Sequence, residues 1–212
     1  WSEPKPRDGV AMDLGPCVAI MRERLGPGAI ICNGAGNFSG WWHRYWRYGS
    51  QPSQLAPTSG TMGYGLPAAV AAALRFKDRP VVCVAGDGDF LMNGQELATA
   101  AQHGADLLVI LVDNASYGTI RMHQEREYPK RVSATELSNP DFVKLAEAYG
   151  GSAERIEGTG DFAPALAGNA DHRAVLEAKR RSDRGREAVT HGAGRGRKLG
   201  RHRAVAPVTV PP

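Results

Sequence analysis

Short apolar runs alternate along the chain with stretches in which apolar residues recur every three or four positions. The short apolar runs are typical of strands that are buried on both faces. The regularly spaced apolar residues are typical of helices that pack along one side. We expect strands over residues 29–32, 80–85, 107–112 and 153–157. We expect helices over residues 14–25, 66–76, 93–103 and 139–150. The alternation predicts the α/β class: a three-layer, doubly wound parallel sheet with helices on both faces.

Polar residues, prolines and glycines mark the expected helix ends. Asp13 can cap the first helix, which the sequence Gly26-Pro27-Gly28 then stops. Asn93 and Glu96 have the spacing of a capping box at the start of the third helix. Asn139 is expected to cap the last helix, with proline at its first position.

The helix and strand patterns stop after Leu166. Residues 173–203 are dense in Arg, Gly and His, and only residues 174–177, a possible last strand, and 187–190 look like ordinary protein. Two explanations stay open: a gene read out of frame, which we favour, or a basic disordered tail. The expected division is a linker remnant, a binding domain and an irregular basic tail, over residues 1–12, 13–167 and 168–212.

Composition narrows the class of protein. Hydrophobic residues make up 42% of the chain, and no apolar run reaches the roughly 18 residues that span a bilayer. From its polar, proline-containing start we expect no signal peptide in residues 1–13. The net charge of +4 belongs to the tail, because 11 Lys/Arg face 5 Asp/Glu from residue 161 onward. The cysteines lie in or beside apolar runs, which indicates reduced, buried thiols in a cytoplasmic protein: Cys17, Cys32 and Cys83.

The strongest chemical signal is Gly86-Asp87-Gly88 after one expected strand and Asn114 after the next. In a parallel sheet both follow the carboxyl ends of adjacent strands, where open α/β sheets bind ligands. A carboxylate and an amide oxygen suit Mg²⁺ rather than zinc, and phosphate, water and a backbone carbonyl would complete the shell. Gly88 would leave room for a phosphate beside free helix N–H groups. A tight turn alone would explain the glycines, but the spacing to Asn114 favours diphosphate–Mg²⁺ binding.

From about residue 14 to about residue 166 the chain resembles the C-terminal diphosphate-binding domain of thiamine diphosphate (ThDP) enzymes. The segment GDGDFLMNGQELATAAQHGADLLVILVDNASYGTIRM is similar to the signature block of the acetolactate synthase and benzoylformate decarboxylase group. The resemblance implies that Asp87 and Asn114 bind Mg²⁺ through their side chains and Ser116 through its carbonyl. It also implies that backbone N–H groups hold the diphosphate, those of Gly88, Asp89 and Phe90.

A second block, residues 58–67, is similar to the family's loop under the aminopyrimidine ring of the cofactor. The resemblance implies that Met62 bends the cofactor and donates its N–H to the ring, and that the Gly60 carbonyl accepts from the 4′-amino group. A glycine turn before a packed helix would explain this block alone, but its position about 25 residues before the first block favours the functional interpretation. The residues expected to bind the cofactor are Gly60, Met62, Gly86, Asp87, Gly88, Asp89, Phe90, Asn114 and Tyr117.

The sequence departs from the family pattern at two positions. The family usually has a second Asn where this chain has Asp113, and many members have Ser where it has Asp89. A carboxylate at position 89 would repel a diphosphate unless the side chain turns away. Neither departure changes the two expected metal ligands.

Other segments have weaker signals. Residues 34–40 look like a dinucleotide fingerprint, but the following residues are aromatic rather than small, which argues against nicotinamide binding. Residues 117–123 either line the substrate side or pack, and residues 124–131 form a surface loop or a subunit contact. Core or subunit packing is the first expectation for the aromatic cluster, with the rim of the site as the alternative: Trp41, Trp42, Tyr45 and Trp46.

The resemblance implies a decarboxylating carboligase that acts on a small 2-keto acid, like the acetolactate synthase large subunit. A benzoylformate- or oxalyl-type decarboxylase and a non-catalytic remnant are the alternatives. The activating glutamate of the family lies in a separate N-terminal pyrimidine-binding domain, so this chain alone is expected to be inactive. The expected partners are that domain and further copies of the enzyme, as a homodimer or homotetramer, and neither a specific nucleic acid nor a membrane.

Overall fold

The computed structural model of the protein describes residues 3–49, 52–169 and 174–179. Six parallel strands form one sheet in the order β2-β1-β3-β4-β6-β5. Their bounds are β1 Ile30–Asn33, β2 Gln54–Leu55, β3 Val81–Gly86, β4 Leu108–Asp113, β5 Ser152–Ile156 and β6 Ala174–Lys179. The chain runs from β1 outward to β2 and then returns to β3 on the other side of β1. This reversal of direction is what defines a doubly wound sheet, so the predicted fold class is confirmed.

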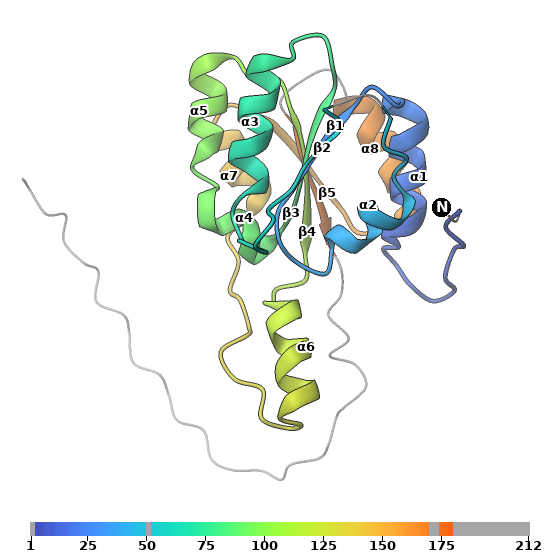
Figure 1. Ribbon diagram of the computed structural model, residues 1–212, viewed down its shortest axis with the longest axis vertical. Helices are drawn as coiled ribbons and strands as arrows, with labels where there is room; N and C mark the ends of the chain where they lie inside the picture. Colours follow the sequence, from blue (N-terminus) through green and yellow to red (C-terminus); the bar gives the residue numbers. More distant parts are fainter. Residues whose placement is uncertain (1–2, 50–51, 170–173, 180–212) are drawn as a thin grey trace, which may run out of the picture. The chain divides into compact units, whose positions relative to one another are not determined.

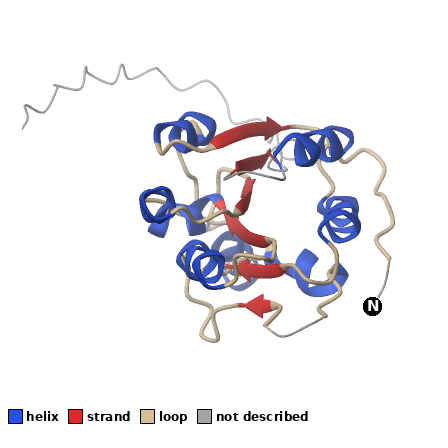
Figure 2. Ribbon diagram, turned by 90° about the horizontal axis from the view of Figure 1, so that it is seen from above, coloured by secondary structure: helices blue, strands red, loops and turns tan. Residues whose placement is uncertain are grey.

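Helices cover both faces of this sheet (Figures 1 and 2). One face carries α1 Leu14–Leu25, α2 Ser39–Tyr45 and α8 Phe162–Asn169, the last preceded by the 3₁₀ turn Thr159–Asp161. The other carries α3 Gly65–Arg75, α4 Asp87–Asn93, α5 Glu96–His103 and α7 Phe142–Ala148. The remaining helix, α6 Gly118–Glu127, extends away from the sheet and buries none of its residues (Figure 1).

Successive strand residues point to opposite faces and therefore enter two separate hydrophobic cores. In β4, Leu108 and Ile110 pack toward α1 and α8, whereas Val109 and Leu111 pack toward α3 and α7. All six residues of β3 and all six of β4 are buried. This explains why both strands read as continuous apolar runs in the sequence.

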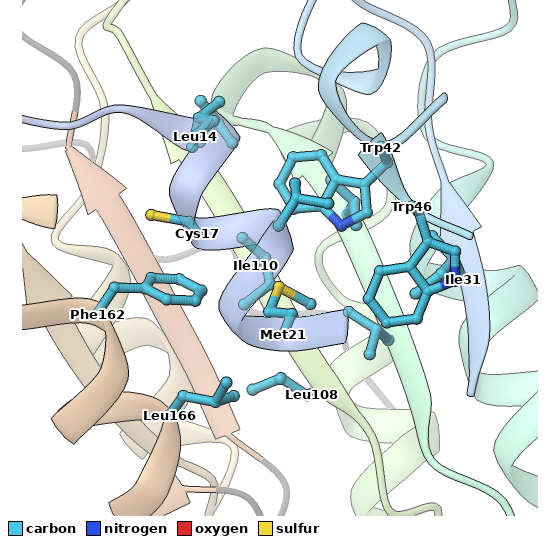
Figure 3. Close-up of a cluster of buried hydrophobic side chains, with 14 of the residues drawn as sticks. Leu14, Cys17, Met21, Ile31, Trp42, Trp46, Leu108, Ile110, Phe162 and Leu166 are labelled. Carbon is cyan, nitrogen blue, oxygen red and sulfur yellow. The ribbon is translucent and has the colours of Figure 1, made fainter. Parts of the chain in front are cut away.

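Two tryptophans of the aromatic cluster are core residues. Trp42 and Trp46 are fully buried beside α1, together with Met21 and Ile31 (Figure 3). Trp41 and Tyr45 are only partly buried at the edge of the same cluster. The packing interpretation is thus confirmed for the first pair.

Several predicted helix ends are wrong. Asn93 does not open a capping box with Glu96, because it is the last residue of α4, which begins directly at Asp87. Asn139 does not cap α7, whose N-cap is Asp141. The expected surface loop after residue 123 continues α6 as far as Glu127.

The last strand is the one predicted from residues 174–177. It lies between β4 and β5, and its Glu177 is buried and accepts a hydrogen bond from Arg155 Nε at 3.0 Å. The chain therefore continues the fold as far as residue 179. Residues 187–190 and the proposed out-of-frame stretch after residue 179 lie outside the described residues.

The thiols agree with the expectation of buried, reduced cysteines. Cys17, Cys32 and Cys83 are buried and free. Burial raises the pKa of Cys17 and of Cys32 to about 12, so both thiols are protonated at neutral pH. None of the helices in the described part of the chain is long and apolar enough to cross a membrane.

The start of α1 provides a test of helix capping. Asp13 accepts hydrogen bonds from the Gly15 N–H at 3.2 Å and from Arg7 Nη2 at 2.8 Å. Burial opposes its charged form, but these hydrogen bonds outweigh burial and hold the pKa of Asp13 below its usual value. We expect Asp13→Ala to lower the free energy of unfolding by about 1–2 kcal/mol at pH 7.

This difference should depend on pH in one direction. A carboxyl group with a lowered pKa stabilises the fold above its unfolded-state pKa, and that stabilisation is lost as the pH falls through the folded-state value. Urea unfolding at pH 7 and at pH 3 measures both, with the exposed Asp8→Ala as the control. An effect of equal size at both pH values would contradict the role of the charge.

Candidate functional site

A cavity of about 280 Å³ opens at the carboxyl ends of β1, β3 and β4. Three segments line it, one following each strand: residues 35–38, 86–89 and 114–120, the last without Ala115. Met62 and Trp41 add side chains from two other segments. The cavity lies where the chain reverses direction between β1 and β3, which is the usual ligand position in a doubly wound sheet.

The two residues of the strongest sequence signal meet in this cavity. The Ser116 N–H donates to Asp87 Oδ2 at 3.3 Å and to Asn114 Oδ1 at 3.2 Å, so the two side-chain oxygens converge on one backbone atom. Ala115, between Asn114 and Ser116, has a positive φ of 52°. The structure therefore places Asp87 beside Asn114, as the sequence predicted.

Asn139 joins this pair, although the sequence interpretation gave it a capping role. Its side-chain N–H group donates to Asp87 Oδ2 and to Asp113 Oδ1, both at 2.8 Å. It thereby lies between two carboxylates that face each other at the ends of adjacent strands. Nothing near residue 139 in the sequence signals this role, because the contact spans 52 residues.

The carboxylates at this edge carry an excess of negative charge. Burial raises the pKa of Asp87, the hydrogen bonds from Asn139 and Gly88 oppose this effect, and the neighbouring Asp113 adds to it. Asp113 is itself buried, whereas the buried Glu177 of β6 is paired with Arg155. A cation at the Asp87 and Asn114 oxygens would offset this charge.

The glycines next to Asp87 allow close packing rather than a turn. A Cβ at Gly88 would lie 2.5 Å from Tyr117 Cε1, so the missing side chain makes room for this ring. A Cβ at Gly86 would lie 3.0 Å from the ring of Phe38. The Gly88 N–H donates to Asp87 Oδ1 at 2.9 Å. Space for a phosphate beside Gly88 stays a prediction.

The second sequence block lies partly in the cavity wall. Met62 lines the cavity, whereas Gly60 is exposed and lies outside the lining. Gly60 and Gly63 have φ angles of 68° and 84°, which a residue with a side chain would adopt only under strain. Phe90, from the first block, is buried against α7 with its ring edge-on to Phe142.

Asp89 lines the cavity, and its buried carboxylate accepts hydrogen bonds from two neighbouring loops. Its Oδ1 accepts hydrogen bonds from the N–H groups of Ala35 at 3.1 Å and Gly63 at 2.8 Å. The side chain is 3% exposed, and burial raises its pKa. The expectation that Asp89 turns away from a bound diphosphate stays a prediction.

Two segments with weak sequence signals also reach the cavity. Residues 35–38, set aside as a dinucleotide fingerprint, form one wall, and the Asn37 N–H donates to Thr119 Oγ1 at 3.0 Å. Trp41 supports the rim alternative for one member of the aromatic cluster. Tyr117 and Ile120 line the opposite side.

Comparison with known proteins identifies the family of this domain. Residues 34–178 match the family described as "Thiamine pyrophosphate enzyme, C-terminal TPP binding domain". The acetolactate synthase large subunit of Parasynechococcus marenigrum is 41% identical over 128 residues, which cover 59% of this chain and 21% of that protein. Isozyme 2 of the same large subunit from Escherichia coli is 34% identical over 153 residues, 71% of this chain and 27% of that protein.

A solved structure has the same fold. The thiamine diphosphate-dependent 4-hydroxybenzoylformate decarboxylase of Rhodococcus jostii RHA1 superposes with a TM-score of 0.74 and 30% sequence identity. The superposition covers 84% of this chain and 34% of that one. The chain thus spans about a quarter of the curated relatives and a third of this structure.

Proposed function

Because the chain belongs to the thiamine pyrophosphate enzyme family through its C-terminal TPP-binding domain, we propose that it binds ThDP through a Mg²⁺ ion. The proposed metal ligands are the side chains of Asp87 and Asn114 and the carbonyl of Ser116. The observation that carries the proposal is the convergence of Asp87 Oδ2 and Asn114 Oδ1 on the Ser116 N–H inside the cavity.

The donor set fits this ion. A carboxylate and an amide oxygen are hard ligands, and Mg²⁺ is usually bound by one or two such groups together with phosphate oxygens and water. Asp87 and Asp113 accept hydrogen bonds from the same Asn139 amide group, and a divalent cation beside them would offset the charge of these two carboxylates. No cluster of three or more His, Cys, Asp or Glu suited to a metal occurs in the described ranges, so a closed protein-only site is not an alternative there.

The chain's residues divide the work of holding the cofactor. Backbone N–H groups of Gly88, Asp89 and Phe90, at the start of α4, would hold the diphosphate. Met62 and Gly60 would hold the aminopyrimidine ring from the loop before α3, and Gly86 and Tyr117 would pack beside the diphosphate. When bound, ThDP supplies the electron sink for decarboxylation of a 2-keto acid.

For the whole protein we propose a decarboxylating carboligase, a transferase resembling the acetolactate synthase large subunit. The runner-up is a ThDP-dependent decarboxylase, favoured by the likeness to the 4-hydroxybenzoylformate enzyme. In either case an N-terminal pyrimidine-binding domain would supply the activating glutamate, and two or four copies would assemble. The chain alone would bind the cofactor without turnover.

The test is a calorimetric titration of the chain with ThDP, first in excess Mg²⁺ and then in excess EDTA. We expect saturable binding with Mg²⁺ and at least about tenfold weaker binding after metal removal, because the diphosphate then lacks its counter-charge. Circular dichroism under both conditions shows whether the fold is retained. Equal affinity with and without the metal would contradict the proposal.

A further inference from the structure

One buried carboxylate joins the loop after β1 to the loop before α3, and each loop contributes residues to the cavity lining. Asp89 Oδ1 accepts from Ala35, in the loop after β1, and from Gly63, in the loop before α3. Asp89 itself is the third residue of α4. These two hydrogen bonds, called the Asp89 bridge below, connect three segments far apart in sequence, since the contacts span 54 and 26 residues.

The peptide at Gly63 is held from both sides by the same helix. Its N–H donates to Asp89, and its carbonyl accepts from Asn93 Nδ2 at 2.9 Å. Asp89 and Asn93 are four residues apart, so they lie on one face of α4. Gly63 is in the left-handed region, with φ 84°. The position of Met62 therefore depends on α4.

Glycine at position 34 leaves space for the Asp89 carboxylate. A Cβ at Gly34 would lie 1.9 Å from Asp89 Oδ2 and 2.2 Å from Oδ1, so no side chain at position 34 can coexist with Asp89 in this orientation. A Cβ at Gly65 would lie 2.8 Å from the Gly34 nitrogen. The glycines at positions 34 and 65 therefore allow the close approach of these segments to one another and to the Asp89 carboxylate.

We propose that Asp89 is a positioning residue that fixes the Met62 loop at the distance from α4 that ThDP requires. It acts through backbone N–H groups and without touching the cofactor with its side chain. The inference rests on the proposed function, because it assigns the two ends of one ligand to two segments: the diphosphate to the start of α4 and the aminopyrimidine to the loop of residues 60–63. The bridge sets the spacing between these segments.

The Asp89 bridge depends on one acceptor oxygen, so two substitutions of similar size can separate its presence from its loss. Both hydrogen bonds go to Oδ1, while Oδ2 is buried and accepts none from the described residues. Asp89→Asn keeps an oxygen acceptor for both N–H groups. Asp89→Leu has a similar size and removes both acceptors. A role in positioning therefore predicts opposite behaviour for the two variants.

Hydrogen exchange measures the bridge without any cofactor. In the full chain, Asp89→Leu is expected to speed exchange in residues 58–65 relative to β3 and β4, whereas Asp89→Asn leaves it near the wild-type rate. Asn93→Ala is a second, partly exposed variant that loosens the same peptide and keeps the core intact. Asp106→Asn, an exposed acid, is the control. No local change in Asp89→Leu and Asn93→Ala, or a change spread evenly over the sheet, overturns the bridge.

Binding then separates positioning from a general loss of stability. With Mg²⁺ present, Asp89→Leu is expected to weaken ThDP binding about tenfold or more and to leave inorganic diphosphate within about threefold of wild type. Asp89→Asn should restore most of the ThDP affinity. Equal weakening of both ligands overturns the positioning role. If the wild-type chain binds neither ligand while the exchange result holds, the proposed function fails, and the positioning role fails with it, but the bridge stands.

Discussion

Asp87→Asn is expected to abolish Mg²⁺-dependent binding of ThDP, with an affinity at least about 100-fold below wild type. Substitutions in the outer shell of metal sites commonly cost about 10- to 100-fold, and Asp87 is the one charged side chain in the proposed ligand set. The Asn side chain keeps the size of Asp87, so the change removes the charge and one of two acceptor oxygens while it conserves the packing volume. Calorimetry at saturating Mg²⁺ measures the loss.

The matched comparison is Asp106→Asn, an exposed acid outside the cavity lining, which should bind like wild type. Asn114→Leu, which removes the amide oxygen, is expected to weaken binding in the same direction and by less, because a neutral ligand is lost. A folded Asp87→Asn chain that binds ThDP as tightly as wild type would place the metal elsewhere. The convergence of Asp87 and Asn114 would then be structural only.

The two proposed side-chain metal ligands were accessible from the sequence because each directly follows a strand. β3 and β4 are buried on both faces, so their apolar runs locate the strand ends to within a residue. The parallel sheet then brings Asp87 and Asn114 to one edge. The positions of the two strand ends, together with the rule that open α/β sheets bind ligands at the carboxyl ends of their strands, were enough to predict this pair.

Asn139 and the Asp89 bridge were not accessible in the same way. The contact of Asn139 with Asp87 spans 52 residues, and the partners of Asp89 are backbone N–H groups that carry no sequence signature. The sequence did raise the question at position 89, since a carboxylate beside a diphosphate had to turn away. It could not say toward what, because loop positions are fixed by tertiary packing.

The errors in helix ends have one physical origin. Asparagine favours helix starts, yet neither Asn93 nor Asn139 caps a helix. The Asn93 side chain donates to the Gly63 carbonyl, and the Asn139 side chain donates to two carboxylates. Local preference for a cap is worth about 1 kcal/mol and yields to tertiary hydrogen bonds of equal or greater value. Near this cavity, the two asparagines that depart from the capping preference, Asn93 and Asn139, instead connect segments that are distant in the sequence.

The cavity walls in turn depend on the core beneath them, and Trp42 tests this. Trp42 is fully buried among Leu14, Met21 and Ile31 (Figure 3), and Trp42→Ala is expected to lower the free energy of unfolding by about 3–5 kcal/mol. Urea unfolding followed by circular dichroism measures it. Trp41→Ala is the matched variant: this partly buried neighbour lines the cavity, so its loss should cost under about 1.5 kcal/mol. Equal costs for the two tryptophans would mean that α2 packs differently and that Trp41 is a core residue rather than part of the cavity wall.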